Sequence, residues 1–304
     1  MSGILHSVVV PCARPERLPA LAAAVRRQTG LAGGMELVVA TPRRPGDDSG
    51  AGAADVVWVE TGELFAPGRM RNLGAAQARG RFLFFIDDDC LPPPEWMAAS
   101  LRVLDTRPDV AAVGCRVVGA AGDFWSRCAD YVLFSATQSR HSGYRHLGSG
   151  ALAVRTEVFR QAGGFDESLL ASEDWDFGLR IQAAGWKSYF EAGVAVAHDH
   201  RRGSLRGILA QAHRSGWLSG LAVQRRHAAV LGPCARLAVH FSRLPTLYPF
   251  FALPYAALLT LLHAWEMRGV DRRWPLFLPF LAAGRLAYQF GVWRQLCREA
   301  STRE

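Results

Sequence analysis

Short apolar runs alternate with helical patterns along the first 90 residues. Four runs of bulky apolar residues predict strands, at residues 6–12, 35–41, 55–60 and 81–87. Apolar positions recur at helical spacing at residues 15–29 and 68–79, and the segment 42–55 is rich in turn-forming residues. Strands that alternate with helices predict an α/β fold with a mostly parallel, Rossmann-like sheet flanked by helices. In such a sheet, ligands bind at the carboxyl ends of the strands.

The pattern changes after Arg201. Residues 244–265 contain no Asp, Glu, Lys or Arg over 22 positions, which is enough to cross a bilayer core of about 30 Å, although three prolines interrupt the helix. A second apolar stretch, 274–293, contains Arg285 and is more typical of an interfacial helix.

These patterns predict two domains. The first is an α/β domain at residues 1–203, and the second is a C-terminal, hydrophobic, helical and membrane-associated region at residues 204–304. A helical subdomain that packs on the first domain is the alternative for the second region.

The net charge of +8 is concentrated in the C-terminal region. From Asp199 to Glu304 the sequence has 15 Arg, no Lys and 5 acidic residues, a charge of +10, so the first 198 residues carry −2. Such an excess favours an anionic partner, either nucleic acid or a phospholipid surface. The arginines alternate with Trp, Leu and Phe and no nucleic-acid-binding motif is recognised, which favours a membrane surface over nucleic acid. Six scattered cysteines without a CxxC pair are typical of a reducing compartment. The cytoplasmic face of the cell membrane is therefore the predicted location.

Three consecutive carboxylates, Asp87, Asp88 and Asp89, follow the apolar run FLFFI. Like charges repel one another, and the end of a buried strand is a costly place for them unless a cation lies opposite. A D-x-D pattern at a strand end suits a hard divalent cation, Mg²⁺ or Mn²⁺, that also binds a diphosphate. A solvated acidic turn is the structural alternative.

Two further polar clusters lie in the second half of the predicted α/β domain. The segment SEDWDFGLRIQAAGW (172–186) has helical spacing, and Glu173 and Asp174 fall at the predicted helix start, where carboxylates also serve as caps. The run VAVAHDHRR (194–202) places His198 and His200 behind a predicted strand. The alternatives to a functional role are a helix cap for the acids and an ordinary polar strand end for the histidines.

Together, these segments resemble the ordered motifs of glycosyltransferase family 2, whose members have the GT-A nucleotide-sugar fold. The segments are RNLGAAQARGRFLFFIDDD, FFIDDDCLPPPEW, GSGALAVRTEVFRQAGGFDESLLASEDWDFGLRIQAAGW and VAHDH, and the resemblance extends from about Ser7 to His200. It implies a metal-dependent, inverting glycosyltransferase of the hexosyltransferase type. The donor would be a nucleoside-diphosphate sugar and the acceptor a hydroxyl group. With the hydrophobic region, we expect that acceptor to be lipid-linked or a cell-envelope glycan.

The resemblance also implies which residues bind the donor. Pro11 corresponds to the proline that ends the family's first strand beside the nucleotide base. Arg71 and Asn72 match the pair before the central strand, where the arginine faces the nucleotide. Asp87 would contact the ribose side of the donor, with Asp88 next to it.

The catalytic and metal-binding roles are implied in the same way. Asp89 would bind the metal, with His198 as the better match for a late metal ligand and His200 as the second. Glu173 and Asp174 match the family's acidic pair, whose aspartate acts as general base on the acceptor hydroxyl.

The sequence departs from the family pattern at two places. Ala40 and Thr41 stand where the family usually has an aspartate that reads the base, so the base is left open. After the proline, Cys12, Ala13 and Arg14 replace the usual Tyr-Asn, and Arg14 is predicted to contact phosphate or base in their stead.

The sequence argues against two other classes of protein. A sugar-phosphate nucleotidyltransferase would have a glycine-rich phosphate loop near its N-terminus, and VVVPCARPERL contains no glycine. A catalytically silent membrane scaffold would keep the hydrophobic region but would gain nothing from the acidic clusters.

Overall fold

The computed structural model describes residues 4–45, 56–145 and 147–302. The chain divides into two compact units. Unit 1 comprises Met1–Val118, His141–Ser168 and Glu173–Asp199, and unit 2 comprises Gly119–Arg140, Leu169–Ser172 and His200–Glu304. The domain boundary at residue 203 stays a prediction, and most of the predicted turn segment 42–55 lies outside the described residues.

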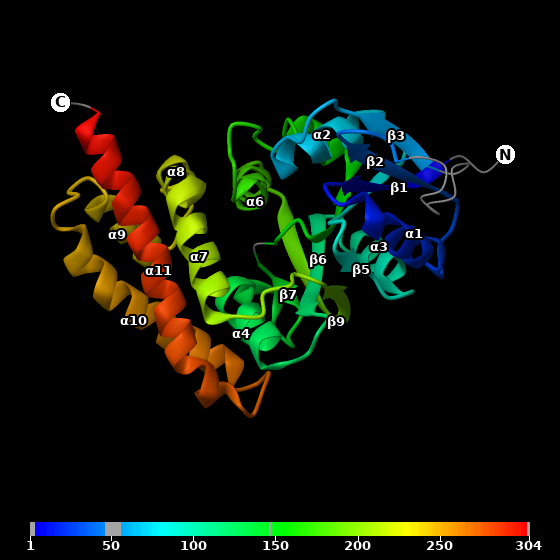
Figure 1. The fold of residues 1–304 in the computed structure, drawn as a ribbon. Coiled ribbons are helices and arrows are strands. Elements are labelled where there is room, and N and C mark those ends of the chain that lie inside the picture. Colours follow the sequence, from blue (N-terminus) through cyan, green and yellow to red (C-terminus); the bar gives the residue numbers. More distant parts are fainter. Residues whose placement is uncertain (1–3, 46–55, 146, 303–304) are drawn as a thin grey trace. The chain divides into compact units, whose positions relative to one another are not determined.

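The described residues of unit 1 form a nine-stranded sheet in the order β3-β2-β1-β4-β8-β6-β9-β5, with β7 paired to β9 (Figure 1). The strands are β1 (Ile4–Pro11), β2 (Gly34–Thr41), β3 (Val56–Glu60), β4 (Phe82–Ile86), β5 (Cys90–Leu91), β6 (Val110–Gly119), β7 (Gly143–Tyr144), β8 (Ala151–Arg155) and β9 (Lys187–His198). Strands β1 to β4 pair in parallel. Beyond them, β8 pairs antiparallel with β4 and β6, and β9 pairs antiparallel with β5 and β7.

The α/β class predicted from the apolar runs is confirmed. The four predicted strands are β1, β2, β3 and β4. The two predicted helices correspond to the short 3₁₀ helix η1 (Pro15–Arg17) followed by α1 (Leu18–Arg26), and to α2 (Pro67–Gln77).

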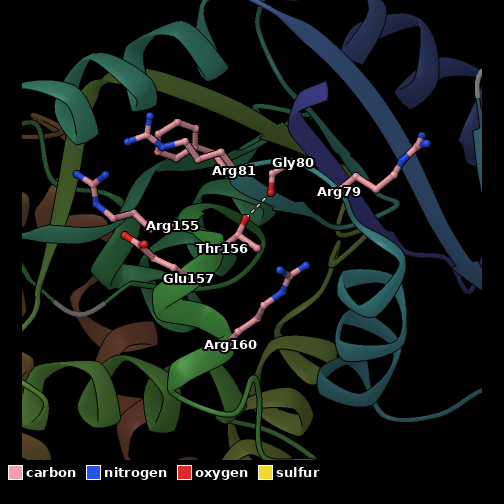
Figure 2. Close-up of a pocket in the computed structure, with 8 residues that line it drawn as sticks. Arg79, Gly80, Arg81, Arg155, Thr156, Glu157 and Arg160 are labelled. Atoms are coloured by element: carbon pink, nitrogen blue, oxygen red, sulfur yellow. Dashed lines mark hydrogen bonds between the residues drawn. The ribbon is translucent and has the colours of Figure 1, made fainter. Parts of the chain in front are cut away.

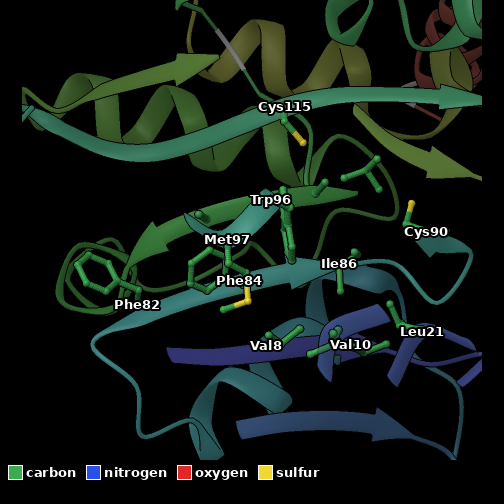
Figure 3. Packing of buried hydrophobic residues seen from close by; sticks show 14 of the residues in the cluster. Val8, Val10, Leu21, Phe82, Phe84, Ile86, Cys90, Trp96, Met97 and Cys115 are labelled. Carbon is green, nitrogen blue, oxygen red and sulfur yellow. The ribbon is translucent and has the colours of Figure 1, made fainter. Parts of the chain in front are cut away.

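Helices cover both faces of the sheet because consecutive strand residues are buried on opposite sides. Val8 and Phe84 belong to a cluster with residues of α1 and α3 (Trp96–Thr106), in which the Trp96 and Phe84 ring centroids are 5.4 Å apart (Figure 3). Val9 and Phe85 belong to a second cluster with residues of α2, α5 (Thr156–Gln161) and α6 (Glu173–Ala183). A strand buried on both faces requires an apolar run without alternation. The run VVV of β1 and the run FLFFI of β4 meet this requirement.

Unit 2 is helical in its described residues. Its elements are α4 (Phe124–Leu133), η4 (Ser135–Thr137), α7 (Leu205–Ser215), the π-helix η5 (Gly216–Gly220), α8 (Leu221–Arg226), α9 (Pro233–Phe241), α10 (Tyr248–Met267) and α11 (Trp274–Ser301). One buried cluster joins Tyr131 of α4 to Phe277 of α11, and another joins Leu221 of α8 to Phe251 of α10.

Glycines allow close approach between α11 and the helices α7 and η5. A Cβ atom at Gly216 would lie 2.1 Å from the backbone oxygen of Tyr288, and one at Gly291 would lie 2.2 Å from that of His213. Gly216 and Gly220 have the small-xxx-small spacing that lets helix backbones approach in membranes. The packing of unit 2 therefore depends on the absence of side chains at these positions.

One face of α10 is apolar and exposed. The buried face includes Ala252, Ala256 and Thr260, whereas exposed apolar side chains lie along the other face: Phe250, Leu253, Leu258, Leu261, Leu262 and Trp265. Among the described residues, α10 is the helix that is long and apolar enough to cross a membrane, judged by length and composition alone.

Candidate active site

The three consecutive carboxylates at residues 87–89 lie directly after β4, and cationic side chains from distant parts of unit 1 face them. Asp87 accepts a hydrogen bond from Arg71 Nη2 at 2.5 Å. Asp88 and Asp89 both pair with Arg14, and Asp89 also lies 3.3 Å from His198. The cations that the acidic run requires are therefore supplied in part by the protein itself.

Asp88 holds the loop that follows β1. Its side chain is only 2% exposed, and Oδ2 accepts hydrogen bonds from the backbone N–H groups of Ala13 and Arg14, both at 2.8 Å. The other oxygen accepts from the Arg14 guanidinium. Asp88 thus fixes the loop in which this sequence departs from the family pattern, and its contact with the donor stays a prediction.

Strand pairing places Asp89 beside His198. Cys90 at the start of β5 pairs with His198 on β9, and the Asp199 N–H donates to the carbonyl oxygen of Asp89 at 2.8 Å. Although burial opposes the charged form, the hydrogen bond from His198 and the charges of His198 and Arg14 lower the pKa of Asp89 to about 2. Asp89 is therefore a carboxylate at any physiological pH.

The residues around Asp89 fit the predicted divalent cation. Asp89, Cys90 and His198 present ligand atoms that lie within 4.8 Å of one another. A carboxylate oxygen and an imidazole nitrogen are suitable ligands for Mn²⁺, and the carboxylate suits Mg²⁺. Burial raises the pKa of the Cys90 thiol well above its ordinary value, so the thiol stays protonated and is a poor ligand for a hard cation. Asp89 and His198 are therefore the ligands that this structure offers.

Arg71 joins the acidic run after β4 to the acidic pair at the start of α6. Its buried guanidinium donates from Nη2 to Asp87 and, at 2.7 Å, from Nη1 to Glu173. Burial and the neighbouring charge of Asp174 nevertheless raise the pKa of Glu173 above its ordinary value. Because Arg71 contacts one carboxylate from each acidic cluster, the two clusters belong to one site.

Asp174 lies in the first turn of α6, where Ser149 orients its carboxylate. Oδ2 accepts from the Ser149 backbone N–H at 3.0 Å and lies 3.3 Å from Ser149 Oγ, while Oδ1 accepts from the Trp175 N–H at 2.7 Å. A Cβ atom at Gly148 would be 3.6 Å from Asp174 Oδ2, and one at Gly150 would be 3.4 Å from Asp87 Oδ2. The segment 148–150 therefore runs past both acidic clusters.

Two residues that contact the acidic clusters, Ser149 and Arg17, are not indicated by any motif of the sequence. Arg17 donates to Asp199 Oδ2 at 2.9 Å and lies 3.9 Å from Asp89. The only signal for Ser149 was its place between two glycines, and for Arg17 its spacing of three residues from Arg14.

Pro11 and Asn72 occupy different surroundings. Pro11 ends β1 and pairs with Ala40 of β2, at the carboxyl edge where the acids lie. Asn72 bonds instead to the backbone of Phe165, donating at 2.8 Å and accepting at 2.9 Å, and also donates to Glu167. These contacts account for Asn72 structurally, and its role in donor binding stays a prediction.

His200 belongs to unit 2, whereas the other predicted site residues belong to unit 1. Its Nε2 lies 3.7 Å from Asp130 Oδ1, and its ring stacks on Phe134. It is not part of the potential ligand group of Asp89, Cys90 and His198 found among the described residues. Of the two predicted histidines, His198 is the one that the structure brings to Asp89.

A pocket of about 330 Å³ lies at the other end of β4, where the strand begins (Figure 2). Its lining residues are Arg79, Gly80, Arg81, Phe82, Arg155, Thr156, Glu157 and Arg160. Arg155 donates to the carbonyl oxygens of Leu104 and Val110, Arg160 donates to that of Ala78, and Arg79 pairs with Glu36. The arginines of this pocket thus tie neighbouring loops and strands to one another.

Comparison with solved structures identifies the class of fold. The structure is similar to the mannosyltransferase PcManGT from Pyrobaculum calidifontis, solved with GDP-Man and Mn²⁺, with a TM-score of 0.59 and 18% identity over 93% of this chain and 86% of that one. It is also similar to GalNAc-T7, solved with UDP, GalNAc and Mn²⁺, with a TM-score of 0.57 and 14% identity over 80% of this chain and 51% of that one. These proteins confirm the predicted GT-A fold.

The sequence then identifies the family. Residues 82–292 match the model described as glycosyl transferase family group 2, and the chain belongs to this family. The pre-mycofactocin glycosyltransferase of Mycobacterium tuberculosis is 31% identical over 166 residues, which are 52% of this chain and 35% of that relative. The chain therefore spans about a third of the length of this curated relative.

Proposed function

We propose that this protein transfers a sugar from a nucleoside-diphosphate sugar to a hydroxyl group of an acceptor. The observation that carries the proposal is the Asp89–His198 pair at the carboxyl end of β4, beside the loop that follows β1. The carboxyl edge of parallel strands is where nucleotides bind in open α/β sheets. The solved proteins of similar fold were obtained with GDP-Man or UDP and with Mn²⁺, which supports this class of donor.

Asp89 and His198 would hold the divalent cation, Mg²⁺ or Mn²⁺. When bound, such a cation supplies positive charge against the negative charge that develops on a departing diphosphate. Asp89 is suited to this role because its lowered pKa keeps it ionised. Arg71 pairs with both Asp87 and Glu173 and so fixes the positions of these two carboxylates within the site.

Asp174 is the proposed general base. It would take the proton of the acceptor hydroxyl as that oxygen attacks the sugar from the face opposite the diphosphate, which inverts the anomeric centre. Ser149 orients the carboxylate by two contacts to the same oxygen, Oδ2. Glu173 is committed to Arg71, which leaves Asp174 as the member of the pair better placed for the proton transfer.

The same site argues against the two other classes. A nucleotidyltransferase needs backbone N–H groups of a loop free for phosphate, whereas two N–H groups of the loop after β1 bond to Asp88. A silent scaffold has no use for a carboxylate held beside a histidine at the strand end. Binding of a donor would exclude the scaffold, and turnover would separate the two kinds of transferase.

The first test is donor binding by calorimetry. Nucleotide sugars with different bases are screened with Mn²⁺, and the best one is measured again with EDTA. Asp89→Asn should weaken both the cation and the donor, by more than the roughly 10-fold expected from a lost charge-assisted hydrogen bond. Asp109→Asn removes an exposed carboxylate that pairs with Lys187 and is the matched control. Unchanged affinities in the Asp89 variant would remove this residue from the site.

We further propose that unit 2 binds the surface of a membrane and that the acceptor is lipid-linked or a cell-envelope glycan. Phe250 is 77% exposed and Trp265 is 69% exposed, so α10 presents a long apolar face. Arg268 stacks on Trp265 at 3.6 Å, in the pairing of aromatic and basic side chains that is common at membrane interfaces. The glycine-mediated packing of α11 is of the kind found between membrane helices. The cytoplasmic face, where positive charge collects, is the proposed location.

The second test uses liposomes that contain anionic lipid. The full chain should sediment with them and stay bound in high salt, because apolar contact adds to an electrostatic attraction of about 1 kcal/mol per basic residue. Leu261→Glu places a charge on the exposed face of α10 and should reduce the bound fraction severalfold. Leu64→Glu, at another exposed leucine that lies in unit 1, is the matched control. Full-chain protein that stays in the supernatant would contradict the membrane proposal.

A further inference from the structure

Arg14 lies on the carboxylate that would hold the divalent cation. Its Nη2 donates to Asp89 Oδ2 at 2.8 Å and also to Asp88. The opposite oxygen of Asp89, Oδ1, faces His198. Both oxygens of the Asp89 carboxylate therefore lie beside a hydrogen-bond donor of the protein itself.

A divalent cation at Asp89 and the guanidinium of Arg14 would repel each other. Two positive groups on one carboxylate lie within a few ångströms of each other, a range at which like charges repel strongly near a protein surface. The Arg14 side chain is 40% exposed, so it can leave the carboxylate without passing through the core. Its departure would also leave the loop in place, because Asp88 still accepts the backbone N–H groups of Ala13 and Arg14.

We propose that Arg14 is an internal counter-cation that competes with the divalent cation for Asp89 and is drawn away by the diphosphate of the donor. This inference rests on the proposed function of the site. A guanidinium binds phosphate oxygens in a bidentate manner and is suited to the exchange of a carboxylate partner for a phosphate partner. Arg14 also has an N–H group available for a phosphate oxygen, because its Nε has no hydrogen-bond partner among the described residues.

The exchange of partners by Arg14 would couple the binding of the nucleotide to the binding of the divalent cation. Without nucleotide, the cation must displace Arg14 and binds weakly. With nucleotide, the phosphates take over Arg14, and Asp89 is left to the cation. Because coupling between two ligands is reciprocal, the cation should strengthen nucleotide binding by the same factor.

The experiment measures Mn²⁺ binding by calorimetry, without sugar and without turnover. In the wild-type chain, Mn²⁺ affinity is compared with no nucleotide, with UDP and with GDP. In Arg14→Gln, the affinity for Mn²⁺ alone should rise by about 10-fold, the scale of one lost charge-assisted contact, and the enhancement by nucleotide should shrink. Arg14→Lys keeps the charge on a shorter side chain without the planar guanidinium, so its hold on Asp89 should be weaker and its affinity for Mn²⁺ alone should lie between the other two.

The control is Arg69→Gln, which removes one positive charge of unit 1 from a half-exposed pair with Glu167 and should leave Mn²⁺ affinity as in the wild type. Equal or weaker binding of Mn²⁺ alone in both Arg14 variants would overturn the inference, and the lysine variant keeps this test open if the glutamine variant fails to fold. Failure of the proposed function gives a different result, in which neither nucleotide binds with Mn²⁺ present.

Discussion

Asp174→Asn is expected to lower turnover by at least about 10²-fold while donor binding stays nearly unchanged. The amide has almost the size of the carboxylate but cannot accept the acceptor's proton, and a positioned general base contributes about 10²–10⁴-fold to a rate. Donor affinity should survive because the proposed contacts to the donor lie in the loop after β1 and in the acidic run after β4, and not at Asp174. The measurements are the rate of sugar transfer and the calorimetric affinity for the donor.

The competing explanation is that Asp174 only stabilises the start of α6, since its Oδ1 accepts the Trp175 N–H. In that case the variant would unfold more easily and the folded fraction would turn over normally. Thermal unfolding of the same preparation separates the two explanations. Asp109→Asn again controls for the loss of one carboxylate at an exposed position of unit 1.

Much of unit 1 could be predicted from the sequence because local patterns there agree with the fold. Apolar runs identified β1 to β4, and the parallel pairing of these strands places the acids of residues 87–89 at the carboxyl edge of the sheet. The pairing of β5 with β9 was outside such reasoning, since it joins Cys90 to His198 across more than 100 residues. The local pattern therefore shows His198 only as a histidine behind a predicted strand, and its role beside Asp89 is implied by the resemblance to the family.

Other contacts were missed because side-chain orientation is decided by tertiary structure. The sequence suggested Arg14 as a ligand for the donor, but its bonds to Asp88 and Asp89 depend on how the loop after β1 meets the end of β4. Asn72 is next to Arg71 in the sequence, yet in a helix neighbouring residues point in different directions. Arg71 therefore reaches the acids while Asn72 bonds to Phe165.

Local sequence patterns also do not show that the segment Gly119–Arg140 belongs to unit 2. The chain returns to unit 1 after this segment. Helix α4 has an amphipathic pattern that shows which of its faces is buried. The pattern does not show the partner of that face, which in the structure includes Phe277 of α11. Hydrophobic periodicity predicts burial, and only the fold determines what lies opposite.

Arg71→Gln is expected to destabilise unit 1 by about 3–5 kcal/mol at neutral pH, the cost of removing one partner from a buried ionic group. Arg71 is 3% exposed and is the cation that both Asp87 and Glu173 contact, at 2.5 and 2.7 Å. Without it, the buried carboxylate of Glu173 would face the carboxylates of Asp87 and Asp174 with no cation between them. Hydrogen exchange of β4 amides measures the loss locally, without assuming that both units unfold together. Arg69→Gln, which breaks a half-exposed pair, should change the same exchange very little.

The pH dependence of this variant should have the opposite sign to ordinary acid denaturation. Burial and Asp174 already raise the pKa of Glu173 in the folded state, and removal of Arg71 takes away the charge that opposes this shift. A carboxyl group whose folded pKa is raised favours folding below its unfolded pKa of about 4.3 and loses that contribution as the pH rises through the folded value. The loss of stability relative to the wild type should therefore be largest at neutral pH and should shrink as the pH falls towards 4–5.

Adding Glu173→Gln to Arg71→Gln should recover part of this stability at neutral pH, because one of the two unpaired charges is then gone. A deficit that does not depend on pH, and that the second substitution does not reduce, would mean that Arg71 stabilises the fold through packing against Phe165 and not through its charge.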